Sequence, residues 1–195
     1  ESDAWVDVLA FRSTLEKSQA TVVELEAAVA CYRDDFLCGF SLADSDLFEE
    51  WLVIQRERFR SLAFDAHTRL VEAYTTQGDY KQALSHARRT ILLDPFREGA
   101  QQTFMRLLAY DGQPNQALIQ YERFSALLAD EISVEPLDET TRLYLQIRDG
   151  TLKIPRSDAV NFPAFLKYIN DTTPAKSLFV NFEDEMSHLD HFLNH

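Results

Sequence analysis

The residues that could hold a metal or carry catalysis are few in this sequence, and most are isolated. Three histidines near the C-terminus, His188, His191 and His195, have spacings that could place metal ligands on one helix face. All three lie at the very end of the chain, where a solvated helix explains them more simply. We therefore expect a solvated helix over about residues 184–193 and no metal site.

Other side chains support catalysis no better. No serine lies in a nucleophile-elbow sequence, His67 and His86 are separated in the sequence, and the carboxylates are spread along predicted helix surfaces. Cys31 and Cys38 have no histidine cluster beside them, so neither a zinc site nor a disulfide framework is predicted. We expect a protein that is not an enzyme, with no catalytic residue, cofactor or metal, in the reducing cytoplasm.

The charge of the chain limits its partners. The 195 residues carry a net charge of −13, whereas DNA binding depends on Lys and Arg that neutralise phosphates. No apolar run is long enough to cross a bilayer. Direct DNA binding and membrane insertion are therefore not expected. Positive charge gathers in residues 51–100, and Arg56, Arg58 and Arg60, close to Trp51, form one candidate docking surface.

These side chains must be positioned by helices. Only 5 glycines and 6 prolines occur, which disfavours a fold with many turns. Apolar residues three and four positions apart predict helices at 5–15 and 21–32, the second capped by Thr21 with Glu24 three residues later. A single long helix is predicted over 47–76.

The boundaries of the long helix follow from its neighbours. Gly78 is a typical left-handed residue after a helix end. Before the helix, residues 36–46 break the helical period, so we predict a loop whose aromatic residues, Phe36 and Phe40, tuck under neighbouring helices.

A repeat gives these helices an architecture. Residues 78–84 align with residues 112–118 at an offset of 34, with Gly, Gln, Ala and Leu in register. Thirty-four residues is the tetratricopeptide period. In such a unit, Gly ends the first helix in a left-handed conformation and the small Ala lets the second helix approach closely. The fold class predicted is all-α, a tetratricopeptide-like right-handed stack of antiparallel helical hairpins.

The repeat assigns the helices to hairpins. Residues 64–77 pair with 80–93, and 98–110 pair with 115–129. Residues 20–33 are predicted as the second helix of an earlier, degenerate unit. A helix over 137–148, with Leu143, Tyr144 and Ile147, caps the stack and ends at Gly150. This domain is placed at 1–150, and the prolines after Gly150 indicate a linker.

The groove of such a stack is lined by the first helix of each hairpin. The template places four candidate partner-binding residues there: Arg69 and Glu72 in the first unit, Gln102 and Arg106 in the second. The two arginines could pair with a carboxylate or a helix end of a partner. Two alternatives stay open, namely a purely solvated groove and a groove covered by the linker with its aromatic residues Phe162, Phe165 and Tyr168.

Seven stretches between residues 32 and 150 form a recognisable series: YRDDFLCGF (32–40), EWL (50–52), QRERFR (55–60), GDYKQAL (78–84), LDPFRE (93–98), ALIQYER (117–123) and VEP (134–136). In this order they resemble the bacterial transcriptional activator domain of SARP-type regulators. The resemblance implies a winged-helix DNA-binding domain before this one. In longer relatives an ATPase follows, and residues 179–185 look like its opening, although Asn181 and Phe182 depart from the family's Gly and Arg. The resemblance thus implies that residues 151–195 are a linker and the start of a following, ATPase-like domain.

The resemblance and the repeat together suggest a regulatory, protein-interaction domain. It would couple a DNA-binding winged helix to a downstream sensor or ATPase module. Its partners would be other domains of the same regulator, a second copy, or RNA polymerase. The alternative is a stand-alone tetratricopeptide-type adaptor that docks peptides, and a third reading is small-molecule sensing within the stack.

Overall fold

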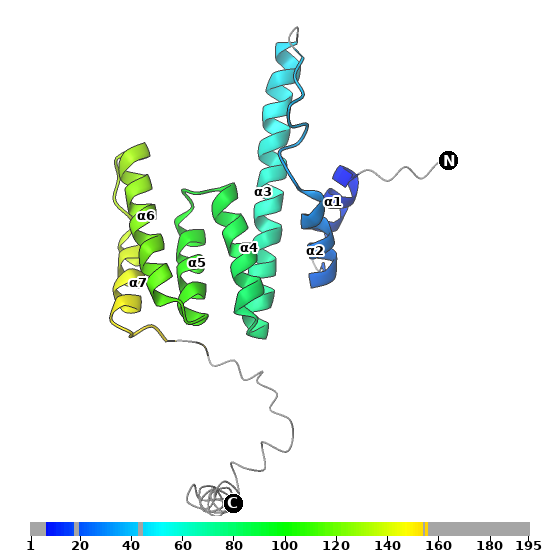
Figure 1. The fold of residues 1–195 in the computed structure, drawn as a ribbon. Helices are drawn as coiled ribbons and strands as arrows, with labels where there is room; N and C mark the ends of the chain where they lie inside the picture. The colour runs from blue at the N-terminus through cyan, green and yellow to red at the C-terminus, as the bar shows by residue number, and fades with distance from the viewer. Residues whose placement is uncertain (1–6, 18–19, 43–44, 154, 156–195) are drawn as a thin grey trace, which may run out of the picture. The chain divides into compact units, whose positions relative to one another are not determined.

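The computed structural model describes residues 7–17, 20–42, 45–153 and 155. All of them belong to the first of two units of the chain, Glu1–Ser157. This part contains seven α-helices and no strand (Figure 1). The helices are α1 (Asp7–Leu15), α2 (Val22–Cys31), α3 (Asp46–Gln77), α4 (Tyr80–Leu93), α5 (Glu98–Tyr110), α6 (Pro114–Ile132) and α7 (Asp138–Arg148).

Successive helices pack side by side as antiparallel pairs. The second half of α3 pairs with α4, and α5 pairs with α6, while α4 and α5 join the two hairpins (Figure 1). At one side α7 packs on α5 and α6, and at the other α2 packs between α1 and α3. The predicted all-α, tetratricopeptide-like stack is confirmed.

The helix ends follow the local signals in the sequence. Thr21 accepts a hydrogen bond from the Glu24 backbone N–H and Glu24 reaches back to the Thr21 N–H, so the capping box is present. The long helix is continuous and ends before Gly78, which has φ 77°. Only α6 differs appreciably from its predicted range, because it begins at Pro114 and continues to Ile132, where Ser133 adopts the left-handed conformation.

The two copies of the 34-residue repeat end their first helices with the same backbone hydrogen bond. The Asp79 N–H donates to the Tyr74 carbonyl at 2.9 Å, and the Gln113 N–H donates to the Leu108 carbonyl at 2.8 Å. In both turns the preceding glycine has a positive φ. Each turn therefore satisfies the free carbonyls at the helix end by the same six-residue loop.

Two glycines are expected to respond in opposite directions to replacement by alanine. At Gly112 φ is +76° and an added Cβ meets no atom within 4 Å, so Gly112→Ala should destabilise the fold by about 1 kcal/mol through backbone strain alone. Gly99 lies in the first turn of α5 with equally open space, so Gly99→Ala should stabilise it by about 0.5 kcal/mol. Urea unfolding of the two variants checks the signs, and equal shifts would contradict the argument.

The buried residues form separate clusters along the stack. Ala83 and Ala117, equivalent residues of the repeat, are both completely buried where the second helices approach their partners. They belong to one cluster with Met105 and with the capping residues Leu143 and Ile147 of α7. A separate aromatic cluster around Phe59 joins α1, α2 and the loop to α3.

Several predictions fall on residues outside the described part. These are the linker aromatic residues Phe162, Phe165 and Tyr168, the ATPase-like opening at 179–185, and the terminal helix with its three histidines. The domain boundary at residue 150 also stays a prediction.

Candidate protein-interaction surfaces

The predicted groove residues lie on α3 and α5. Glu72 is exposed and Arg69 and Arg106 are half-buried. Arg106 lines a hollow of about 330 Å³ together with Arg142 and Gln146 of α7. No side chain in the described part forms an ion pair with Arg69, Glu72 or Arg106. Their charges are therefore available to a partner.

Gln102, the fourth predicted groove residue, is buried under α7 and does not face the groove. Its Nε2 donates to the Thr140 Oγ1 at 2.9 Å. The Thr140 hydroxyl in turn donates to Glu98 of α5. The Glu98 carboxylate also accepts the Leu137 backbone N–H, at 3.1 Å, at the start of α7. Gln102 and Glu98 thus attach α7 to α5, and Gln102 is not available to a partner.

Removing the Glu98 carboxylate should loosen α7. Glu98→Ala leaves the Leu137 N–H and the buried Thr140 hydroxyl without an acceptor, which should cost about 1 to 3 kcal/mol of unfolding free energy. Glu139→Ala is the matched control, because Glu139 is an exposed carboxylate in the first turn of α7, just as Glu98 lies in the first turn of α5. Chemical denaturation compares the two variants. Equal losses would mean that the helix dipole, rather than these hydrogen bonds, carries the effect.

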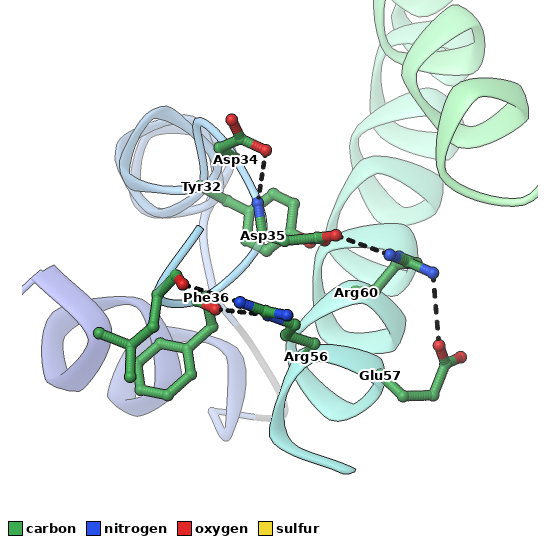
Figure 2. Close-up of polar contacts among 8 residues, drawn as sticks. Tyr32, Asp34, Asp35, Phe36, Arg56, Glu57 and Arg60 are labelled. Atoms are coloured by element: carbon green, nitrogen blue, oxygen red, sulfur yellow. Dashed lines mark hydrogen bonds and ion pairs between the residues drawn. The ribbon is translucent and has the colours of Figure 1, made fainter. Parts of the chain in front are cut away.

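The arginine cluster is divided by the geometry of α3. Arg56 donates from Nε to the Phe36 carbonyl at 2.9 Å and from Nη2 to the Leu37 carbonyl at 2.8 Å (Figure 2). Arg60 donates from Nη2 to the Asp35 carboxylate at 2.8 Å. Both arginines therefore hold the loop before α3.

Further contacts fix the conformation of the loop that they hold. Leu37 has φ 51°, an unfavourable value for a leucine, and Arg56 bonds to its carbonyl. Tyr32 donates from its hydroxyl to Asp35 at 3.1 Å, and burial followed by this hydrogen bond raises the pKa of Tyr32 to about 12. Arg58, by contrast, is exposed and has no ionic partner in the described residues.

The comparisons with known proteins fit this architecture. The family model of the bacterial transcriptional activator domain matches residues 7–148. The chain belongs to this family. Its members form the tetratricopeptide-like domain of SARP-type transcriptional regulators. Among curated proteins nothing matches.

One solved structure is similar to the activator domain. It is that of Mycobacterium tuberculosis EmbR in complex with a low affinity phosphopeptide, with 19% sequence identity and a TM-score of 0.54. The match covers 87% of this chain and 42% of EmbR, so the chain spans less than half the length of that protein. This likeness is one of fold. Within the described part, none of the helices is apolar and long enough to be a membrane span.

The first half of α3 gives the activator domain an apolar surface that the sequence analysis did not identify. Leu47 is 80% exposed and Ile54 is 64% exposed, although both are large aliphatic residues. Trp51 is half-exposed while its ring contacts Phe36 and Phe48. The signal was present in the sequence, because apolar residues occur on both sides of this helix and not on one stripe.

A buried polar network ties α2 of the activator domain to α3 and α4. Glu26 accepts from the Tyr74 hydroxyl at 2.8 Å and pairs with the His86 Nε2 at 2.9 Å. His67 and His86, which appeared unrelated in the sequence, meet through their Nδ1 atoms at 3.0 Å. Because a hydrogen bond needs one donor and one acceptor, the two Nδ1 atoms hold one proton between them.

The environment keeps His67 neutral. Burial, then the neighbouring His86 and Arg89, lower the pKa of His67 to about 4. The two rings lie at a hollow of about 650 Å³ between α2 and α4, which Arg89 also lines. In the described residues no group of three or more His, Cys, Asp or Glu side chains is arranged to hold a metal. The network thus serves as a structural attachment of α2 whose strength depends on pH.

Proposed function

We propose that this activator domain is the regulatory, protein-interaction part of a bacterial transcriptional regulator. It couples a winged-helix DNA-binding domain to a downstream sensor or ATPase module. The match of the family over residues 7–148 is the observation that carries the proposal. The net charge of −13 agrees with a domain that leaves DNA contacts to another part of the regulator.

The partner-binding surface in this proposal is the side of α3 and α5 that carries Arg69, Glu72 and Arg106. These side chains have no ionic partner in the described residues, so pairing with a partner requires no internal ion pair to break. Arginine suits a carboxylate or a helix C-terminus of a neighbouring domain. That EmbR, which shares this fold, was solved with a phosphopeptide supports protein interaction as the role.

Coupling would work through the contacts between helical units. Each hairpin packs mainly on its neighbours, so a partner on α3 and α5 changes the free energy of one arrangement of units relative to another. When the arrangement of the units changes, the position of the DNA-binding domain changes with it. RNA polymerase is a further candidate partner of the same surface.

The test separates DNA occupancy from activation in the full-length regulator. Chromatin immunoprecipitation should recover promoter DNA with the unmodified protein and equally with Arg69→Glu/Arg106→Glu. A reporter gene should lose most of its activation with the double variant. Arg123→Glu, at an exposed arginine of α6, is the control and should leave activation unchanged.

Two results would contradict the proposal. If no promoter DNA is recovered, the stand-alone adaptor becomes the better account. If Arg123→Glu lowers activation as much as the double variant does, the effect is one of net charge and the α3 and α5 surface has no special role.

A further inference from the structure

The hollow of about 650 Å³ between α2 and α4 is large enough to hold a small molecule. It is lined by residues of α2, of the loop after α2, of α3 and of α4. Figure 2 shows part of this lining, where Tyr32 and Asp35 face Arg60 of α3. The hollow is distinct from the surface that carries Arg69 and Arg106, since neither of these residues lines it.

His67 presents an unused polar atom at this hollow. The residue is only 7% exposed, and its Nδ1 is bonded to the Nδ1 of His86. Its Nε2 has no hydrogen-bond partner among the described residues, although every fully buried side-chain nitrogen and oxygen there has one. The Nε2 is therefore open to the hollow that the ring lines. A polar atom on an otherwise buried ring favours a ligand that bonds to it.

The other unused polar groups of the lining are cationic. The carboxylates of Glu26, Asp34 and Asp35 already accept hydrogen bonds from this chain. Arg33 and Arg89 line the same hollow, and neither forms an ion pair or a side-chain hydrogen bond within the part of the chain that the structure describes. Each guanidinium carries five N–H donors. The lining therefore suits a ligand with a charged acceptor, such as a phosphate or a carboxylate.

The hollow also offers an apolar contact. Val29 of α2, Leu93 of α4 and Pro95 after α4 lie along it. An ion without an apolar part would leave these side chains in contact with water, whereas a ligand with a short apolar body would bury them. Both kinds of contact are satisfied by a molecule with an acidic group at one end and an apolar body at the other.

We propose that this hollow binds a small organic anion, namely a phosphate or carboxylate group on an apolar body. Arg33 and Arg89 hold the acidic group, and the Nε2 of His67 donates to one of its oxygens. The Nε2 then carries a proton, so the one proton between the two Nδ1 atoms belongs to His86. The ligand contacts α2, α3 and α4 together and so holds α2 in place. The site adds a small-molecule signal to the coupling role proposed above and does not rest on that role.

Four probes test the charge and the apolar body separately. They are phenyl phosphate, phenylacetate, inorganic phosphate and benzyl alcohol, each titrated into the chain Glu1–His195 in a calorimeter. Phenyl phosphate or phenylacetate should bind with a dissociation constant of about 1 mM or below, and the tighter of the two identifies the acidic group. Inorganic phosphate lacks the body and benzyl alcohol lacks the charge, so both should bind about tenfold more weakly or worse.

Single substitutions test the residues that hold the acidic group. Arg33→Ala and Arg89→Ala should each raise the dissociation constant of the tighter anion about tenfold or more. Arg58→Ala is the matched control, because Arg58 is an equally exposed arginine that does not line the hollow, and its effect should stay within about twofold. Circular dichroism confirms that the variants are folded. A long-range proton–nitrogen NMR spectrum of the saturated complex should show the Nε2 of His67 protonated.

Four results would overturn the proposal. Neither organic anion could bind at about 10 mM, benzyl alcohol could bind as tightly as the anions, Arg58→Ala could weaken binding as much as Arg89→Ala, or the Nε2 of His67 could carry no proton in the complex. None of these results bears on promoter recovery or on activation through Arg69 and Arg106, so the two proposals fail separately.

Discussion

Phe59→Ala is expected to release the first part of the activator domain while the later repeats stay folded. The Phe59 ring lies 5.0 Å from the Phe36 ring and 6.4 Å from the Phe11 ring, measured between centroids. It is buried in a cluster with Ala28 and Ala63. Truncating such a phenylalanine costs about 3 to 5 kcal/mol. Because Phe59 joins α1, α2 and the loop to α3, that cost falls on their attachment.

Hydrogen exchange locates the loss. Units of the stack contact mainly their neighbours, so α1, α2 and the loop before α3 should lose protection while α5, α6 and α7 keep theirs. Phe40→Ala is the control, since Phe40 is 48% exposed and, among the described aromatic rings, its ring contacts that of Phe48 alone, so its cost should stay below about 1 kcal/mol. A uniform loss of protection over all helices would show that the domain unfolds as one unit.

The features that could be predicted from the sequence are those set by neighbouring residues. The capping box joins Thr21 to Glu24, and the left-handed Gly78 ends α3, within a few positions of the chain. The 34-residue repeat adds one long-range relation, because equivalent residues must occupy equivalent environments, and Ala83 and Ala117 do so. Together these signals determine the order of the helices and their pairing into hairpins.

The partners of individual polar side chains could not be predicted in the same way. Gln102 occupies a groove position of the repeat, but α7 covers it and Thr140, 38 positions away, takes its amide. The meeting of His67 and His86 depends on how α3 and α4 are rotated about their axes. A single sequence specifies which side of a helix is apolar and leaves that rotation undetermined within a turn.

Helix geometry alone predicts that Arg56, Arg58 and Arg60 do not form a single surface. Successive residues of a helix are about 100° apart, so Arg56 and Arg60 share a side of α3 while Arg58 faces another direction. The structure follows this geometry: two arginines hold the loop and the third lies exposed. Treating three nearby charges as one surface overlooked the period of the helix that carries them.

Acidification is expected to destabilise the activator domain through His67. The pKa of His67 is lowered from 6.5 to about 4 in the folded chain, mainly by burial. In the unfolded chain His67 takes up its proton near pH 6.5, so the unfolded state binds more protons between pH 6.5 and 4. The stabilisation is complete above pH 6.5, falls as the pH decreases, and levels off below about pH 4. The difference corresponds to about 3 kcal/mol.

The groups that face His67 explain why protonation is resisted. The two Nδ1 atoms share one proton, so a second proton between them sets two N–H groups against each other at 3.0 Å. The positive charge of Arg89 acts in the same direction, and the Glu26 carboxylate opposes it. Tyr74 stacks on His86 and donates to the same carboxylate, which confines Glu26 to its place. Protonation should therefore weaken the contact of α2 with α3 and α4.

His67→Asn isolates this effect. The asparagine amide keeps a donor near the position of the Nδ1 but does not titrate. The unfolding free energies of both proteins are measured by urea denaturation from pH 7.5 to about 4.5. In their difference, the contributions of the carboxylates and other histidines that both proteins share cancel. Over this range the unfolding free energy of the original chain should fall by about 2 to 3 kcal/mol more than that of the variant. Parallel curves would mean that His67 is protonated at its ordinary pKa and that the buried pair is not what holds α2 in place.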